Sequence, residues 1–184
     1  MNVKGSALRS TMTFLRERYP EDFCRAILAS LPAAHRAVLE KPILQGGWYD
    51  AAVLYTLMHT IAKASNENEE DLFFRMGKQS CDDGLNTIYK IFFKVGSPSF
   101  ILKHVSQVWG NYYSEGNMVL LAGASNTAHL RLEKVQFPDE ALCHRIRGWM
   151  VRASELSGGK NVRVFHETCV HRGGATCEWK GAWE

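Results

Sequence analysis

Residues 166–179, HETCVHRGGATCEW, carry the densest cluster of reactive side chains in the sequence. Cys169 and Cys177 flank a Gly-Gly pair, and His166 and Glu167 stand just before the first cysteine. The flanking segments KNVRVFHETCV and ATCEWKGAW predict the two strands of a closing β-hairpin. The sequence of the hairpin leaves four interpretations of its cysteines open: a disulfide, a metal site, a catalytic thiol, or ordinary packed cysteines.

The spacing of the cysteines favours a metal site. A three-residue loop at 172–174 would place Cys169 directly opposite Cys177, where the Cβ atoms of paired strands are about 4.5–5.5 Å apart. Such a separation suits two ligands of one tetrahedral ion. Cys143 lies on the expected helix before the hairpin and supplies a third thiol. These three residues therefore predict a structural zinc that ties the helix to the last two strands.

The fourth ligand stays open between His166 and Glu167. Strict strand alternation puts Glu167 on the face of Cys169 and His166 on the other face, unless a bulge intervenes. Five cysteines is an odd number, so they cannot all pair as disulfides. No His/Asn arrangement indicates a catalytic thiol. Packed, reduced cysteine is the alternative for this cluster, and it is the expectation for Cys24 and Cys81.

Composition narrows the class of protein. The chain has 184 residues, 46% hydrophobic and 22% charged, with a net charge of +3. Basic residues are scattered among acidic ones, which argues against nucleic acid as a partner. No apolar run approaches the roughly 20 residues that span a bilayer, and the N-terminus lacks a secretory signal. A cytoplasmic location is therefore expected, where thiols stay reduced and metal binding is favoured over a disulfide.

The hydrophobic periodicity predicts an α+β fold. Residues 1–113 read as helices, among them one from Trp48 through residue 65 and one over residues 97–113. From Gly116 the pattern changes to two strands, a helix that ends at Gly158-Gly159, and the closing hairpin. We expect one domain over residues 1–184: an N-terminal helical layer (1–113) packed on a small antiparallel sheet, with a β-β-α-β-β unit over 114–184.

The C-terminal pattern resembles a known family. Cys143, Gly148, the glycines at 158–159, HETC and HRGGATC resemble the 4-vinyl reductase-type domain, of the ligand-binding fold shared with haem-NO-binding domains and Golgi-transport (TRAPP) subunits. In phenol-sensing members three cysteines and a glutamate bind zinc. The resemblance places the cysteines on Cys143, Cys169 and Cys177, and the glutamate on His166. The whole layout also resembles an uncharacterised family of stand-alone myxobacterial proteins.

The resemblance implies an apolar cavity between helices and sheet, because related domains hold phenols, haem or acyl chains there. The helical half is rich in aromatic residues that can line such a cavity. The candidate walls and polar groups are Trp109, Tyr112, Phe92, Tyr89, His104 and His59. Core packing is the alternative for each of them. The Tyr-x-Ser-x-Arg motif of haem-NO proteins is not present, since YYSEG at residues 112–116 has no arginine in place.

These observations predict a non-enzymatic sensory domain that binds a small apolar or aromatic molecule, contains structural zinc, and signals through a homodimer or a partner protein. A TRAPP-like adaptor or scaffold and a haem- or tetrapyrrole-binding protein are the alternatives. An enzyme of tetrapyrrole reduction is a further reading, but the sequence offers no acid/base pair, nucleotide loop or flavin motif for it.

Overall fold

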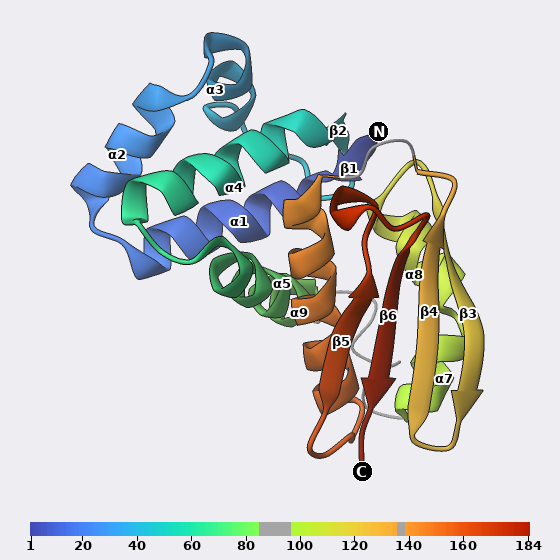
Figure 1. Cartoon of the computed structure of the whole chain (residues 1–184). Coiled ribbons are helices and arrows are strands. Elements are labelled where there is room, and N and C mark those ends of the chain that lie inside the picture. Colours follow the sequence, from blue (N-terminus) through green and yellow to red (C-terminus); the bar gives the residue numbers. More distant parts are fainter. Residues whose placement is uncertain (85–96, 136–138) are drawn as a thin grey trace.

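The computed structural model describes residues 1–84, 97–135 and 139–184, which form a lobe of helices beside a four-stranded sheet (Figure 1). The α+β class is confirmed. The helical lobe contains β1 (Asn2–Lys4), α1 (Gly5–Arg18), α2 (Glu21–Ser30), α3 (Ala33–Leu39), β2 (Trp48–Asp50), α4 (Ala51–Ser65) and α5 (Glu69–Gly84). The sheet side contains α7 (Pro98–Lys103), α8 (Val105–Tyr112), β3 (Asn117–Ala124), β4 (Thr127–Glu133), α9 (Glu140–Leu156), β5 (Arg163–Thr168), the 3-10 turn η1 (Val170–Arg172) and β6 (Cys177–Ala182).

The helical lobe has its own core, built around α1 and α4. Seven residues of α4 are buried, because apolar side chains cover most of its surface. The expected helix starts later than the sequence indicates: Trp48–Asp50 forms β2, which pairs antiparallel with β1. Asp50 then caps α4, accepting a 2.9 Å hydrogen bond from the Ala52 N–H. A strong helix cap thus fixes the boundary that hydrophobic periodicity alone misplaced.

The sheet is antiparallel with strand order β3-β4-β6-β5. Along β4, Ala128, Leu130 and Leu132 are buried while the residues between them are not, as the alternation of the sequence predicts. On the opposite face, Arg131 Nε donates to Glu178 Oε1 at 2.7 Å on the neighbouring strand. The β-β-α-β-β order of the tail is confirmed.

Helices α5 and α9 cross in close contact at two glycines, and this crossing joins the helical lobe to the sheet side (Figure 1). A Cβ atom on Gly77 would lie 2.0 Å from the Arg145 carbonyl oxygen, and one on Gly148 would lie 1.9 Å from the Phe74 carbonyl oxygen. Since real Cβ atoms do not approach an oxygen so closely, both positions require glycine for the two backbones to touch.

Two elements of the sheet side differ from expectation. The helix expected over residues 97–113 is two helices, α7 and α8, because His104 leaves the helical conformation at φ −113° and ψ 14°. The closing hairpin lacks the expected three-residue loop: β5 ends at Thr168, and η1 precedes β6. Gly173 supplies the positive φ of 83° that ends η1, which favours glycine.

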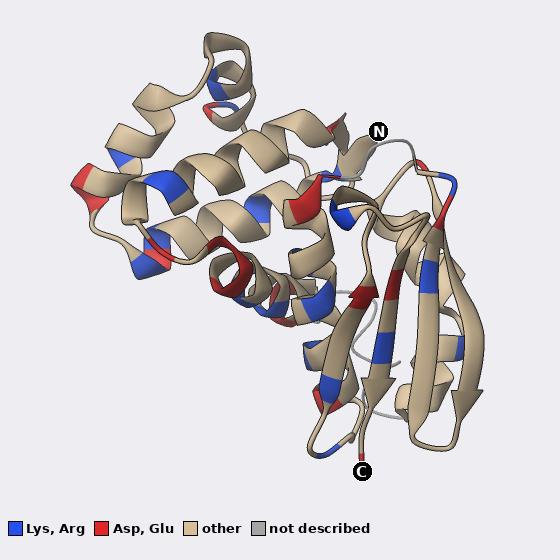
Figure 2. Cartoon of the chain, viewed as in Figure 1, with Lys and Arg blue, Asp and Glu red and all other residues tan. Residues whose placement is uncertain are grey.

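Charged residues of both signs are mixed along the chain, as the sequence predicts. Figure 2 shows basic and acidic residues interspersed over helices and strands, with no continuous patch of either sign in this view. Across the described ranges, no helix is both long enough and apolar enough to cross a membrane.

The glycine crossing predicts a selective loss of stability. We expect Gly148→Ala to lower the free energy of unfolding by about 3 kcal/mol, because its methyl group would force α5 and α9 apart. Gly110→Ala is the control: apart from the neighbouring backbone of α8 itself, no atom of the described residues lies within 4 Å of the position that its methyl group would take, so alanine should leave stability unchanged or raise it by up to about 1 kcal/mol. Urea unfolding measures both, and equal effects at the two sites would contradict the close crossing.

Candidate functional site

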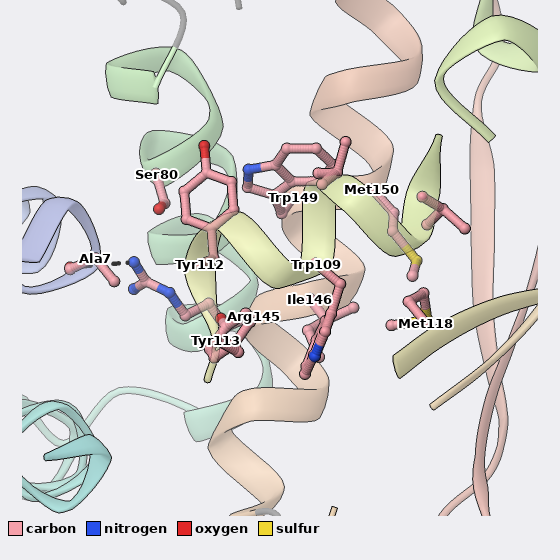
Figure 3. Close-up of a pocket in the computed structure, with 12 residues that line it drawn as sticks. Ala7, Ser80, Trp109, Tyr112, Tyr113, Met118, Arg145, Ile146, Trp149 and Met150 are labelled. Atoms are coloured by element: carbon pink, nitrogen blue, oxygen red, sulfur yellow. Dashed lines mark hydrogen bonds between the residues drawn. The ribbon is translucent and has the colours of Figure 1, made fainter. Parts of the chain in front are cut away.

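A cavity of about 60 Å³ lies where the helical lobe meets the sheet side. Helices α8 and α9 form most of its wall, and α1, α5 and β3 complete it (Figure 3). Apolar and aromatic side chains predominate in the lining, with one cation among them. The lining residues are Ala7, Ser80, Val105, Val108, Trp109, Tyr112, Tyr113, Met118, Arg145, Ile146, Trp149 and Met150.

The aromatic walls hold one another in place. The ring of Trp109 stacks on Tyr113 with centroids 4.2 Å apart, and its Nε1 donates to the Glu115 carbonyl at 2.9 Å. Tyr112 meets Trp149 edge to face at 6.0 Å. Because these contacts fix the rings, the cavity has rigid sides.

Arg145 is the charged member of the lining and is only 2% exposed. Its Nη1 donates to Thr11 Oγ1 at 2.9 Å and its Nη2 to the Ala7 carbonyl at 3.3 Å, so the side chain reaches from α9 to α1 (Figure 3). It also hydrogen-bonds the Tyr113 side chain. Burial lowers the pKa of Arg145, but a guanidinium stays protonated in proteins.

Only some of the residues predicted from the sequence to line a pocket lie at the cavity. Trp109 and Tyr112 line the cavity. His104 lies away from it, with Nδ1 3.0 Å from the Phe100 carbonyl oxygen. Phe92 and Tyr89 lie outside the described residues. Arg145 is not among the residues predicted from the sequence, although the sequence carries a signal for it: Arg145 stands on the apolar face of a helix, three residues after Leu142 and four before Trp149.

His59 also lies away from the cavity and instead connects three helices. Its Nε2 is 2.9 Å from Asp139 Oδ1, and its Nδ1 is 3.3 Å from Glu69 Oε1. Asp139 in turn caps α9 by accepting a 2.8 Å hydrogen bond from the Ala141 N–H. The hydrogen bond to Asp139 is the main cause that raises the pKa of His59 to about 9, against the opposing effect of burial. The contact therefore fastens α4 to the start of α9.

A second cluster brings together Cys143, His166, Cys169 and Cys177. One possible ligand atom from each residue lies within 4.8 Å of the others. Cys143 Sγ is 3.6 Å from Cys177 Sγ, which is 4.0 Å from Cys169 Sγ. All three thiols are buried and reduced. The helix and the hairpin thus converge as the cysteine spacing indicates.

A bulge decides which candidate joins the cysteines. The β5–β6 register shifts between His166 and Thr168, which breaks the alternation expected along the strand. The ring of His166 stacks on Trp179 beside the thiols, with the ring centroids 4.8 Å apart. Both ring nitrogens of His166 are buried, and neither lies within hydrogen-bonding geometry of a described residue. Glu167 instead turns outward and accepts a 3.0 Å hydrogen bond from Lys180 Nζ.

Two contacts shape the environment of the thiols. The Cys169 carbonyl accepts from the Arg172 and Gly174 N–H groups at 3.0 and 2.8 Å, which folds the loop around Cys169. The contact between Cys143 and Cys177 is the largest cause that lowers the pKa of the Cys177 thiol and raises that of Cys143. The Cys177 thiol therefore loses its proton more readily than the Cys143 thiol.

Comparisons with known proteins identify the fold. No family model and no curated protein matches the sequence. Solved structures of H-NOX proteins, which are haem-NO/O2-binding, do match. A crystal structure of a mutant H-NOX protein from S. oneidensis in the Fe(II) state has a TM-score of 0.78 and 14% identity, covering 98% of this chain and 96% of that one. The NMR structure of the Shewanella oneidensis H-NOX domain in the Fe(II)CO state has a TM-score of 0.75 and 15% identity, covering 98% of each chain. Fe(II) unliganded H-NOX from K. algicida has a TM-score of 0.76 and 10% identity, covering 98% and 96%.

These comparisons correct two predictions. The assignment to the 4-vinyl reductase-type family is wrong, because the structures that match almost the whole chain are H-NOX proteins. The prediction of structural zinc as the cofactor is also wrong: the matching proteins are described in Fe(II), Fe(II)NO and Fe(II)CO states, which are states of iron. The prediction rested on the local cysteine pattern of the C-terminal part, whereas the structural matches cover almost the whole chain.

The contact between His59 and Asp139 predicts a pH-dependent stability. Because the pKa of His59 is raised in the folded protein, the contact contributes fully to the free energy of unfolding below about pH 6.5, and this contribution is lost as the pH rises through about 9. His59 is 40% exposed, so solvent screening limits the contribution to about 0.5–1 kcal/mol. We expect His59→Gln to be less stable than the wild type by this amount at pH 6 and equally stable at pH 10, as measured by urea unfolding.

Asp139→Asn serves as the partner variant, since asparagine is also a good helix cap. Combining the two substitutions should add little to the loss from either one at pH 6. Additive losses, or a loss of equal size at pH 6 and pH 10, would contradict the coupling of the two side chains.

Proposed function

We propose that this chain is a non-enzymatic sensory domain that binds a small molecule in the cavity between α8, α9 and β3. The cavity carries the proposal: it has fixed aromatic walls and one buried cation, and sites for small molecules are mostly apolar with a few polar groups that orient the ligand. The H-NOX fold supports it, because the solved neighbours are described in liganded and unliganded states. We place the protein in the cytoplasm and propose that a homodimer or a partner protein transmits the signal.

Haem is a second candidate, favoured by the fold of the chain. Of the functions that the sequence suggests, the H-NOX neighbours support the haem or tetrapyrrole alternative better than an aromatic-ligand sensor with zinc. The described residues do not fit the group. The described lining of the cavity contains tyrosines and methionines, which can bind haem iron, but no histidine or cysteine. A cavity of about 60 Å³ also holds only a few non-hydrogen atoms, far fewer than a porphyrin contains.

The cysteine cluster supports a separate proposal. We propose that Cys143, His166, Cys169 and Cys177 bind one transition-metal ion that prefers thiolate ligands. Three sulfurs and one imidazole converge in a buried position, as soft metal ions require. Packed reduced cysteines are the alternative. The ion would link α9 to the closing hairpin, which is the link that the sequence predicts for these residues.

Blocking the cavity tests the proposed ligand site. Val108→Phe should fill part of the space, and Leu44→Phe, at a residue that is 69% exposed, is the control. We expect small organic molecules to shift the methyl NMR signals of Ile146 and Met118 in the wild type and the control but not in Val108→Phe. Circular dichroism checks that each variant is folded.

The same three proteins are titrated with reduced haem. A stoichiometric Soret band that Val108→Phe abolishes would replace the small-molecule proposal with the haem candidate. If the wild-type protein shows no methyl shift and no Soret band, the result contradicts a ligand-binding function at this cavity.

Elemental analysis tests the metal proposal. Reduced wild-type protein should contain about one thiophilic metal ion per chain. Cys169→Ser should lose it, because serine removes one of the clustered ligands. Cys81→Ser is the control: Cys81 is buried outside the cluster, so this substitution should leave the metal content unchanged. Folded wild-type protein without metal would reduce the cluster to packed thiols.

A further inference from the structure

Arg145 is a buried cation that lacks a close anionic partner among the described residues. No carboxylate oxygen described in the structure lies within 4 Å of its guanidinium. Asp83 acts on Arg145 electrostatically, but its Oδ1 accepts from Gln79 at 3.0 Å, and its Oδ2 is buried and has no hydrogen-bond partner in the described part of the chain. A charge held away from water without a counter-ion costs several kcal/mol, so an anion beside Arg145 would be stabilising.

The neutral partners of Arg145 do not use all the N–H donors of its guanidinium. A guanidinium has five N–H donors in a planar fork. Its described partners are Thr11, the Ala7 carbonyl and the Tyr113 side chain, none of which is charged at neutral pH. The Tyr55 hydroxyl also influences Arg145, and it is buried with no hydrogen-bond partner among described residues. Polar capacity on this side of the cavity therefore exceeds what the described residues use.

The rest of the cavity suits a short apolar group. Trp109 turns its indole N–H to the Glu115 carbonyl, so its ring faces the space as an apolar surface. Ile146 and Met118 line the cavity beside it (Figure 3). A volume of about 60 Å³ is a few times the 10–15 Å³ that one water requires, which is enough for only a few non-hydrogen atoms.

We propose that this cavity binds a short-chain monocarboxylate, whose carboxylate pairs with the Arg145 guanidinium and whose apolar tail packs against Trp109 and Ile146. The inference rests on the proposed ligand-binding function and gives that site its ligand class. A carboxylate matches the planar fork of arginine and forms charge-assisted hydrogen bonds. A neutral ligand of the same size would leave the buried charge uncompensated.

Butyrate is the probe, with 1-butanol and butylammonium as matched neutral and cationic molecules. Titrations of the wild-type protein follow the methyl signal of Ile146 and the guanidinium signal of Arg145 by NMR. We expect butyrate to bind at least about tenfold more tightly than 1-butanol, as a charge-assisted hydrogen bond allows, and to shift both signals. Butylammonium should not bind.

Two arginine variants of α9 locate the effect. Arg145→Met should remove the preference for butyrate. Arg147→Met should keep it, because Arg147 pairs with Glu70 at 2.6 Å and does not line the cavity. If Arg145→Met does not fold, the guanidinium shift in the wild type and its absence in Val108→Phe decide the question.

The outcomes separate the inference from the proposed function. Equal binding of butyrate and 1-butanol at the Ile146 methyl would overturn the carboxylate and leave a ligand-binding cavity in place. No binding of either molecule, together with no small-molecule hit and no Soret band, would overturn both. A preference for butyrate that survives Arg145→Met would also overturn the pairing.

Discussion

The close crossing of α5 and α9 is the constraint on which the other features depend. Gly77 and Gly148 let each helix backbone touch a carbonyl oxygen of the other, so α9 has one position against the helical lobe. At that position Arg145 reaches Thr11 of α1, while the next turn of α9 faces the cavity. The contact between His59 and Asp139 fastens the start of the same helix. Packing at the glycines and polar contacts at either side thus act together to place α9.

Helix α9 is therefore shared by the two candidate sites. Cys143 contributes to the thiol cluster, and Ile146 and Met150 contribute to the cavity wall, all from one rigid element. A ligand that moved α9 relative to the sheet would alter the geometry of the cluster, and a change in the cluster would act on the cavity.

Local patterns in the sequence predicted the sheet well. The alternation along β4 fixed which residues are buried, and the cysteine spacing indicated that Cys143, Cys169 and Cys177 would meet. The bulge after His166 and the turn η1 depend on loop geometry that no periodicity encodes. The role of Arg145 was missed because its hydrogen-bond partner Thr11 lies 134 residues away in the sequence. Family assignment failed for a similar reason, since spacing of a few ligands is a local property and the fold is not.

A crystal structure of the protein as purified, without added ligand, tests the central claim most directly. The claim is that α9 presents a buried cation to a cavity that an anionic small molecule completes. Electron density for a few atoms, ending in a planar group within hydrogen-bonding distance of the Arg145 guanidinium, is the predicted result. A carboxylate side chain of the protein paired with Arg145, in a cavity filled by the chain itself, would contradict it.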